Sequence, residues 1–337
     1  MIMPNNLKGE TLSMKRIVCI VLALALLMAC TAMAEGTSIT TGRPTSEPAH
    51  TMVCQMDNEP PARPQVGVGS ADIVYETETY NGGYTRYTAV FNDTIPDQIE
   101  AIRSARIVHA DIYSDYNGAF IHFGGQKYEG SSVYDYFSTI NVGKRWDGIG
   151  YDNGSQKSDF YRDRSRRAPN NVICRLHNLF EKTDWSGITC NSPLKFSAQA
   201  VIPAAGEQVT SFSIPYRNGY TPSYEWDPSI AKYRRFYNGK PYVDGATNEQ
   251  VTCDNVIVQS MEYAWYNGES DRPKVTTVGT NKCHYFIGSK HFTGYWVRDS
   301  ISENTRYYDD NGNDVLLNPG VTFIQLLKTE KSVEING

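Results

Sequence analysis

The pattern of hydrophobic residues changes near residue 206, and this change restricts the fold more than any other feature of the sequence. Between about residues 52 and 200, short strand-like runs alternate with segments of helical periodicity, such as the stripe Ala105, Val108 and Ile112. From residue 206 onwards, β-branched and aromatic runs are separated by Asn-Gly and Pro-Gly turns. The sequence therefore predicts an α+β protein: an N-terminal mixed α/β domain followed by an all-β C-terminal domain, folded as a sandwich or a bent sheet.

The first residues carry the pattern of an export signal. Lys15 and Arg16 form a basic start, and the apolar run from Ile17 to Ala29 is too short for a comfortable membrane span. We therefore expect residues 1–29 to be removed as a signal peptide and to take no part in the fold.

The end of this apolar run resembles a lipobox. In Leu27-Met28-Ala29-Cys30, Cys30 would be lipidated and become the new N-terminus. This predicts that the membrane is a partner, with the protein anchored by its lipid at the outer face of the cell membrane. Ala32-Met33-Ala34 offers an alternative cleavage site, and cleavage there would give a secreted protein.

Composition divides the mature chain into three segments. Residues 30–50 are rich in Thr, Ser, Gly, Pro and Glu, which predicts a flexible tether. Residues 51–205 are expected to form the α/β domain that holds the candidate site, and residues 206–337 the β-rich domain. The chain contains 23 Tyr against 12 Phe, a choice that suits strands and polar ligand surfaces.

Net charge limits the classes of partner. Removal of residues 1–29 takes away three basic residues and one acidic residue, which changes the formal charge from −5 to −7. An acidic protein is a poor general partner for nucleic acid, because binding to phosphates requires a basic face. The basic run from Arg162 to Arg167 is a local exception. It is either a solvated loop or a surface that attracts anionic envelope material.

The cysteines do not form a disulfide framework or a zinc site. Their number in the mature chain is odd once Cys30 is set aside, and none has C-x-x-C spacing. A single disulfide such as Cys174–Cys190 remains an alternative. The sequence indicates no metal site and no cofactor. The five remaining cysteines are Cys54, Cys174, Cys190, Cys253 and Cys283.

Short motifs are spread over most of the mature chain. They are Ala62-Arg63-Pro64-Gln65 with Gly67, Ala71 to Glu76, Gly82-Gly83, Thr85-Arg86, Ile102 to Arg106, His122 with Gly124-Gly125, Tyr242, Asp244, Asn255 to Val258, Gly294, Trp296 and Asn318-Pro319-Gly320. In their order and spacing, these motifs resemble the YerB-like lipoproteins of Gram-positive bacteria. The resemblance implies an envelope location and a two-domain build, but no established activity. In one place this chain departs from the family pattern: where relatives have Pro-His-Asn, it has Pro169-Asn170-Asn171.

Two arginines mark a candidate anion site. Arg103 and Arg106 stand where a predicted strand leads into a helix, with Ser104 as the expected N-cap. Guanidinium groups beside free N–H groups at the positive end of a helix form a receptor for a carboxylate or phosphate. The alternative is that each arginine pairs with a carboxylate of the fold, such as Glu76 or Asp72.

His122 and Glu76 form the candidate catalytic pair. Ile121 and Phe123 are expected to face the core, which would turn His122 towards an open face beside Gly124 and Gly125. With Glu76 from an adjacent strand as its nearest acidic neighbour, His122 could act in acid–base catalysis. The alternative is a half-buried histidine with ordinary hydrogen bonds.

Three functions remain open at this point. The first is the binding of an anionic or polyhydroxylated envelope component, including an anionic cell-wall or peptide ligand, in one cleft. The second is a cell-wall hydrolase or transferase that uses His122 and Glu76, and the third is an envelope scaffold that binds proteins through its Tyr-rich β domain. Convergence in one pocket would favour the first two, and dispersal the third. The cleft is expected to be lined by Arg63, Glu76, Arg86, Arg103, Arg106 and His122.

Overall fold

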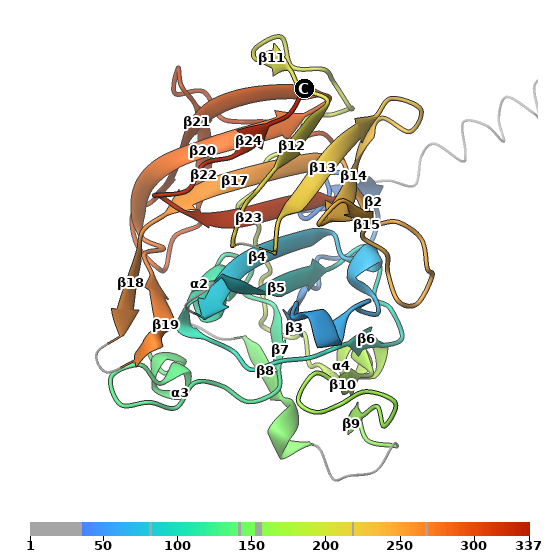
Figure 1. Cartoon of the computed structure of the whole chain (residues 1–337). Coiled ribbons are helices and arrows are strands. Elements are labelled where there is room, and N and C mark those ends of the chain that lie inside the picture. Colours follow the sequence, from blue (N-terminus) through green and yellow to red (C-terminus); the bar gives the residue numbers. More distant parts are fainter. Residues whose placement is uncertain (1–35, 81–82, 141–142, 152–156, 218, 267–268) are drawn as a thin grey trace, which may run out of the picture. The chain divides into compact units, whose positions relative to one another are not determined.

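The computed structural model describes residues 36–337 except 81–82, 141–142, 152–156, 218 and 267–268 (Figure 1). The predicted signal peptide and the lipidation site Cys30 lie outside these residues. Contacts divide the described chain into two units. In the small unit, β1 (Gly36–Thr37) pairs with β2 (Pro44–Thr45), and the large unit contains residues 38–43 and 48–337.

One mixed sheet of eleven strands runs through both halves of the large unit. The two halves of the chain meet where β4 pairs in parallel with β23, so the sheet is continuous across the change in sequence pattern. In spatial order the strands are β11 (Glu207–Gln208), β21 (Lys290–Arg298), β20 (Gly279–Ile287), β17 (Asn255–Met261), β23 (Thr322–Lys328), β4 (Ile73–Tyr80), β5 (Tyr84–Phe91), β3 (Met52–Asp57), β7 (Ala119–His122) and β8 (Lys144–Asp147), and β22 (Arg306–Asp309) pairs with β21.

A six-stranded sheet covers one face of this large sheet (Figure 1). Phe212 and Phe286 stack between the two sheets with ring centroids 3.5 Å apart, within a core that also contains Val74 and Phe323. The six strands are β15 (Lys240–Pro241), β14 (Lys232–Tyr237), β13 (Pro222–Asp227), β12 (Ser211–Ser213) and β24 (Glu334–Ile335), with β16 (Thr252–Cys253) paired with β14.

Helices cover part of the opposite face. Apolar residues of α2 (Ile107–Ser114) and of α3 (Val133–Tyr136) pack in a second core with Val53, Phe120 and Ile324. Because both faces are covered, β4 and β3 are buried along almost their whole length. Such strands have no wet face, although alternation of side chains still decides which core each residue enters.

Smaller elements complete the fold. A three-stranded sheet and helix α4 (Leu176–Lys182) lie beside the first core, and β18 pairs with β19 as a separate hairpin. The 3-10 turns are η1 (Pro60–Ala62), η2 (Val68–Ser70) and η3 (Gly148–Gly150). The remaining strands are β6 (Ile99–Glu100), β10 (Val172–Cys174), β9 (Phe160–Arg162), β18 (Tyr263–Tyr266) and β19 (Glu269–Val275).

The predicted fold class is confirmed: the N-terminal region is mixed α/β with few helices, and the C-terminal region is largely β. The predictions for individual elements were correct at some places and wrong at others. The β4–β5 hairpin is present, but the helix expected to begin at Asn170 or Asn171 is replaced by strand β10 and the shorter helix α4. Within the described residues, none of the helices has the length and apolar character needed to cross a membrane.

Part of the predicted tether is folded. Ser38, Thr40 and Thr41 are buried, and the Thr40 hydroxyl donates to the Asp72 carboxylate at 2.8 Å. The polar composition suggested a tether, but short hydroxyl side chains can also be buried when acceptors are available. Here the acceptors are carboxylates of the large unit, Asp72 and Asp93.

The disulfide alternative is wrong. All five described cysteines are free, and four of them are buried, including Cys174. Burial raises the pKa of the Cys174 thiol well above its ordinary value, so this side chain behaves as a small hydrophobic residue.

Candidate anion-binding site

The chain enters the candidate site between the carboxyl ends of two parallel strands. Beyond the last β3–β7 pairs, Arg103 donates its backbone N–H to Gln55 at 2.8 Å, and Phe123 donates to the carbonyl of Arg103 at 3.0 Å. The segment from Ile102 to Arg106 therefore separates the two strands where they end. Ligands of α/β sheets commonly bind at such a place, because the strand ends diverge there.

Arg106, not Ser104, is the N-cap residue of α2. Its backbone is extended, and its N–H is accepted by Nδ1 of His109 at 3.0 Å. An imidazole at this third helical position takes the part that Glu or Gln plays in a capping box. The predicted N-cap, Ser104, is therefore wrong by two residues. The first turn is capped by the side chain of His109, which lies inside the helix.

Gly124 allows this close packing. Its φ of +73° lies in the left-handed region, and a Cβ at this position would lie 2.8 Å from Cδ1 of Ile149. The Gly124 carbonyl accepts the backbone N–H of Ala105 at 2.9 Å. A residue with a side chain would be strained at this φ and would push against Ile149.

Arginine side chains gather around the phenol oxygen of Tyr80 at the end of β4. Arg86 Nη2 and Arg106 Nη2 donate to this oxygen at 3.2 and 3.1 Å. The guanidinium carbon of Arg272, from β19, lies 4.4 Å from the Tyr80 ring centroid. Together with Arg103, these residues form what we call the arginine cluster: Arg86, Arg103, Arg106 and Arg272 around Tyr80.

Carboxylates neutralise only part of the cluster. Asp57 accepts from Arg103 Nε at 2.8 Å, and Glu59 lies 3.9 Å from the same guanidinium. In the described part of the chain, no ion pair is found for Arg86 or Arg106, and the Nε–H of each is buried without a hydrogen-bond partner. Buried donors without acceptors are costly, so this arrangement is suited to receiving an anion.

The electrostatics reflect this surplus of positive charge. Burial and the neighbouring charge of Arg86 lower the pKa of Arg106 to about 9. Burial alone would raise the pKa of Tyr80, but the combined charges of the arginines lower it. Guanidinium groups stay charged at neutral pH, so Arg106 is a buried cation whose charge is poorly compensated. A bound anion would stabilise this charge.

His109 also belongs to the site, although the sequence patterns described above did not predict it. Its Nδ1 accepts from Arg106, so the neutral ring carries its proton on Nε2, which is buried and has no partner among the described residues. Burial, followed by the charges of Arg86 and Arg106, lowers the pKa of His109 well below its usual value. The sequence signal was its position three residues after Arg106.

His122 is not exposed to a cleft, and Glu76 is not its partner. The ring is fully buried against Phe120 and Phe137, with Nδ1 2.8 Å from the Gly124 carbonyl and 3.8 Å from Asp147 Oδ1. Asp147, on the adjacent strand β8, is its acidic neighbour. Burial lowers the pKa of His122, which favours the neutral ring.

Glu76 lies on the opposite face of the sheet from His122. Residues paired across strands share a face, and the pairs run from Glu76 through Tyr87 and Met56, whereas His122 shares a face with Phe120. Strands β5 and β3 also separate β4 from β7, a spacing of roughly 14 Å. The predicted pairing of His122 with Glu76 is wrong because alternation along a strand does not say which residues of two strands share a face. That depends on how the strands pair in the sheet.

Arg63 is likewise absent from the arginine cluster. Its Nε donates to Asn58 at 3.1 Å, and its guanidinium carbon lies 3.9 Å from the ring centroid of Tyr237. Asn58 in turn donates to Glu76 at 2.9 Å. Of the six residues expected to line one cleft, the structure therefore brings together Arg86, Arg103 and Arg106, with Ser104 between them.

The position that departs from the family pattern borders the cluster. Asn170 Nδ2 donates to Asp57 Oδ2 at 2.6 Å, on the carboxylate that pairs with Arg103. In the nearby basic run, Arg166 donates to the carbonyls of Ala62 and Pro64 at 2.7 and 2.8 Å. Arg166 therefore anchors the loop that contains it. Among the described residues, no group of three or more His, Cys, Asp and Glu could hold a metal ion.

These features define an α+β protein with a cationic site at the carboxyl ends of parallel strands. The chain belongs to the DUF3048 family: residues 39–189 match its N-terminal domain and residues 212–324 its C-terminal domain, both described as protein of unknown function. The YerB resemblance is thereby confirmed.

Two comparisons with one relative, by sequence and by structure, agree with this assignment. The chain is 24% identical over 213 residues to "Putative lipoprotein YerB" of Bacillus subtilis (strain 168), covering 60% of each protein. It also matches the crystal structure of YerB from Bacillus subtilis with a TM-score of 0.75 at 20% identity, covering 89% of this chain and 100% of that one. The second match concerns the fold alone.

Proposed function

We propose that this protein binds an anionic component of the cell envelope at the arginine cluster. The observation that carries the proposal is the pair of buried guanidinium groups, Arg86 and Arg106, for which no ion pair is found among the described residues. The N-terminus of α2 adds the positive end of a helix dipole at the same place. Arg103 and Ser104 are only half-buried, so the cluster reaches the surface.

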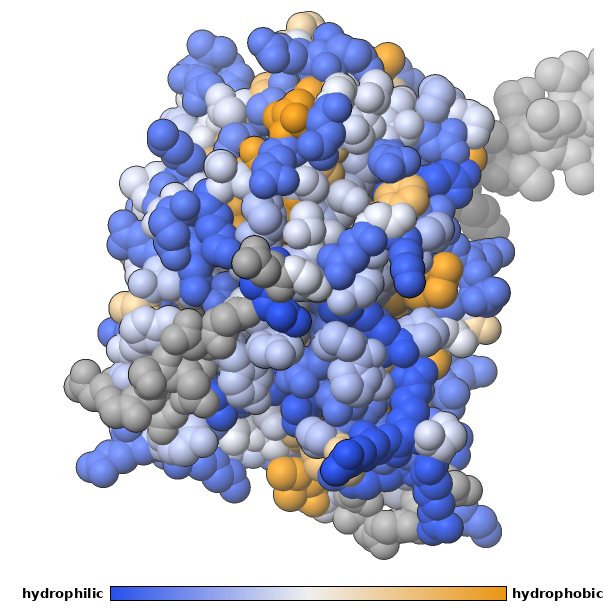
Figure 2. Space-filling view, in the orientation of Figure 1, coloured by the Kyte–Doolittle hydropathy of each residue, from blue (hydrophilic) through white to orange (hydrophobic). Residues whose placement is uncertain are grey.

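The surface is consistent with a polar ligand. In the face drawn in Figure 2, hydrophobic residues form small, separate patches among hydrophilic ones. Large apolar surfaces usually mark protein or membrane contacts, so this face favours a polar or charged ligand over an apolar partner.

The protein acts, in this proposal, outside the cytoplasm and anchored through Cys30 to the membrane. Support comes from the lipobox-like Leu27-Met28-Ala29-Cys30 and from a relative whose name describes a lipoprotein. Replacement of Cys30 by Ala should release the protein from membranes into the soluble fraction. An unmodified N-terminus at Glu35, found by mass spectrometry, would instead support the secreted form.

The geometry does not favour an enzyme that uses His122 and Glu76. A shared substrate cannot lie between two buried side chains on opposite faces of one sheet. Glu76 is also fully engaged by Arg235, Thr85 and Asn58. Binding through the arginine cluster therefore accounts for more of the structure than catalysis by this pair.

Calorimetric titration of the mature protein with inorganic phosphate tests the proposal. Arg106→Met should weaken binding by about 1.5–3 kcal/mol, or roughly tenfold to a hundredfold, because a charge-assisted hydrogen bond is lost. Arg306→Met is a matched control, since Arg306 is an exposed arginine paired with Asp299 far along the chain. Equal phosphate affinity of the two variants would exclude the arginine cluster as the binding site.

A further inference from the structure

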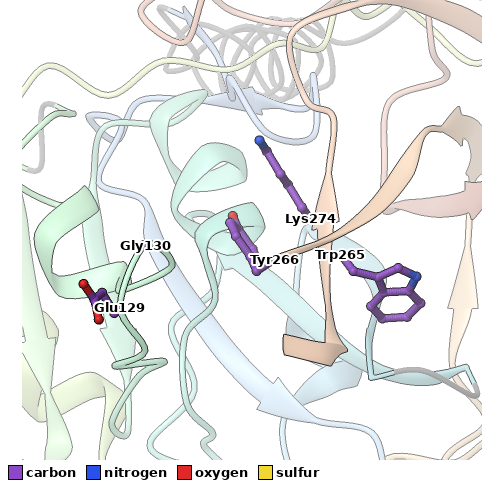
Figure 3. A pocket seen from close by; sticks show the side chains of 5 residues that line it. All are labelled: Glu129, Gly130, Trp265, Tyr266 and Lys274. Carbon is purple, nitrogen blue, oxygen red and sulfur yellow. The ribbon is translucent and has the colours of Figure 1, made fainter. Parts of the chain in front are cut away.

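A pocket is formed by residues that adjoin Arg272 and Tyr128 in the sequence. It has a volume of about 490 Å³ and is lined by Glu129, Gly130, Trp265, Tyr266 and Lys274. Figure 3 shows Tyr266 projecting from the β18–β19 hairpin, which also carries Lys274 and Trp265, towards the Glu129–Gly130 segment. This volume falls within the range of about 300–1,000 Å³ that is usual for small-molecule pockets.

The pocket and the cluster are built from the same two segments. Arg272 and Lys274 stand two residues apart on β19, at a place where the pairing with β18 shifts register. The Arg272 guanidinium carbon lies 4.4 Å from the Tyr80 ring centroid and 5.9 Å from that of Tyr128. Tyr128 directly precedes Glu129 of the pocket wall, so the two segments that line the pocket also supply residues at the edge of the cluster.

The chemistry of the pocket wall differs from that of the cluster. Glu129 and Lys274 carry opposite charges, so the wall has no net charge and offers both an acceptor and donors. Tyr266 adds an aromatic ring with a polar edge, whereas Trp265, which is 39% exposed, projects to the other side of the hairpin (Figure 3). A sugar ring is complementary to such a wall, because its C–H groups pack against aromatic faces while its hydroxyls both donate and accept.

The cluster favours a doubly charged group over a singly charged one. Two guanidinium groups, Arg86 and Arg106, have no carboxylate partner in the described chain, whereas Arg103 is paired with Asp57. A phosphate monoester carries a charge of roughly −1.5 to −2 at neutral pH and has three acceptor oxygens. A carboxylate supplies roughly half to two-thirds of that charge and one oxygen fewer.

We infer that the ligand is a phosphorylated saccharide, with its phosphate monoester in the arginine cluster and its sugar ring in the pocket beside Tyr266. This inference rests on the proposed function, since it names the class of anion that the same cluster would bind. It also assigns a role to the β18–β19 hairpin, which lies in the C-terminal half of the chain but supplies residues to both parts of the site.

Four probes separate the two parts of the site: inorganic phosphate, glycerol 2-phosphate, glucose 1-phosphate and N-acetylglucosamine 1-phosphate. The mature protein should bind at least one sugar phosphate about tenfold more tightly than glycerol 2-phosphate, a difference of about 1.4 kcal/mol. Tyr266→Ala should remove this preference and leave the affinity for inorganic phosphate unchanged. Lys274→Met, at an exposed position, should reduce the preference without any risk to folding.

The outcomes distinguish the inference from the proposed function. If all phosphates bind equally and Tyr266→Ala changes nothing, the sugar pocket is wrong while the anion site stands. If neither inorganic phosphate nor any ester binds, or if Arg106→Met binds them as well as the unmodified protein, the anion site itself is wrong.

Discussion

Buried arginines occur on both faces of the large sheet, but their surroundings differ. On one face Arg235 is 1% exposed, and its Nη2 lies 2.7 Å from Glu76, which also accepts from Thr85 at 2.7 Å. On the other face Arg86 is equally buried, yet its hydrogen bonds go to a carbonyl and a phenol, Ser104 and Tyr80. Burial of a cation therefore does not by itself indicate a binding site. A binding site is indicated when the buried cation also lacks a counter-charge.

The pKa shifts express the same contrast. Burial works against the charge of Arg235, but the surrounding tyrosines and Glu76 outweigh it and raise the pKa. Burial also works against Arg86, and Arg103 adds repulsion, so its pKa is lowered. The charge of Arg235 is therefore compensated within the fold, whereas the charge of the arginine cluster is compensated only in part.

The largest expected effect concerns the paired face. Arg235→Met should lower the free energy of unfolding by about 3–5 kcal/mol, because it leaves Glu76 buried without its cation. Urea unfolding measures this loss. The double variant Arg235→Met with Glu76→Gln should recover part of the stability. A single variant with a loss below about 1 kcal/mol would show that the pair is not the structural element described here.

The second prediction concerns stability gained from an anion. Phosphate at a hundred times its dissociation constant should raise the free energy of unfolding by about 2.7 kcal/mol, because it binds only the native state. Without phosphate, Arg106→Met should unfold at the same urea concentration as the unmodified protein or at a higher one, since a poorly compensated charge is removed. A marked loss of stability in this variant would place Arg106 with the structural arginines.

Local sequence patterns predicted one part of the site well. Arg103 and Arg106 follow a strand and precede a helix, and this order alone placed them at a helix N-terminus. The fold class was also accessible, because turn signals and helical stripes are local features. The position of the cap was wrong by two residues because His109, rather than Ser104, satisfies the first turn.

Long-range partners could not be predicted from one sequence. Arg235 pairs with Glu76 across 159 positions of the chain, and Arg272 reaches Tyr80 from the far half of the chain. Period-two alternation correctly separates Ile121 from His122, but it does not say that helices and a second sheet cover both faces. The predicted catalytic pair of His122 and Glu76 depended on an open face of the sheet, and both faces are covered.

A smaller effect is expected at the edge of the cluster. Glu59 lies 3.9 Å from Arg103 and its side chain is 25% exposed, so it is a weak counter-charge for the site. Glu59→Gln should strengthen phosphate binding by about 0.2–1 kcal/mol, the range for partly exposed ion pairs. Calorimetry measures this gain, and increasing salt should reduce it. Weaker binding in Glu59→Gln would mean that Glu59 orders Arg103 and does not compete with the ligand.

The smallest signal comes from a single phenol, Tyr80. Arg86 and Arg106 donate to its oxygen, and the combined arginine charges lower its pKa below the ordinary value of 10.0. The sign follows from linkage: the phenolate stabilises the native state above pH 10.0, and this contribution is lost as the pH falls through the lowered pKa. Tyr80→Phe should therefore remove the earliest step in the tyrosinate absorbance of the native protein.

Phosphate provides the decisive control for this last titration. An anion bound to Arg86 and Arg106 would repel the phenolate, so saturating phosphate should move the Tyr80 step to higher pH. By the same linkage, phosphate affinity should fall as Tyr80 ionises, and Tyr80→Phe should lose this dependence. A Tyr80 step that phosphate leaves unmoved would show that the phenol and the anion do not share these arginines, and the contrast between the two faces of the sheet would then no longer locate a binding site.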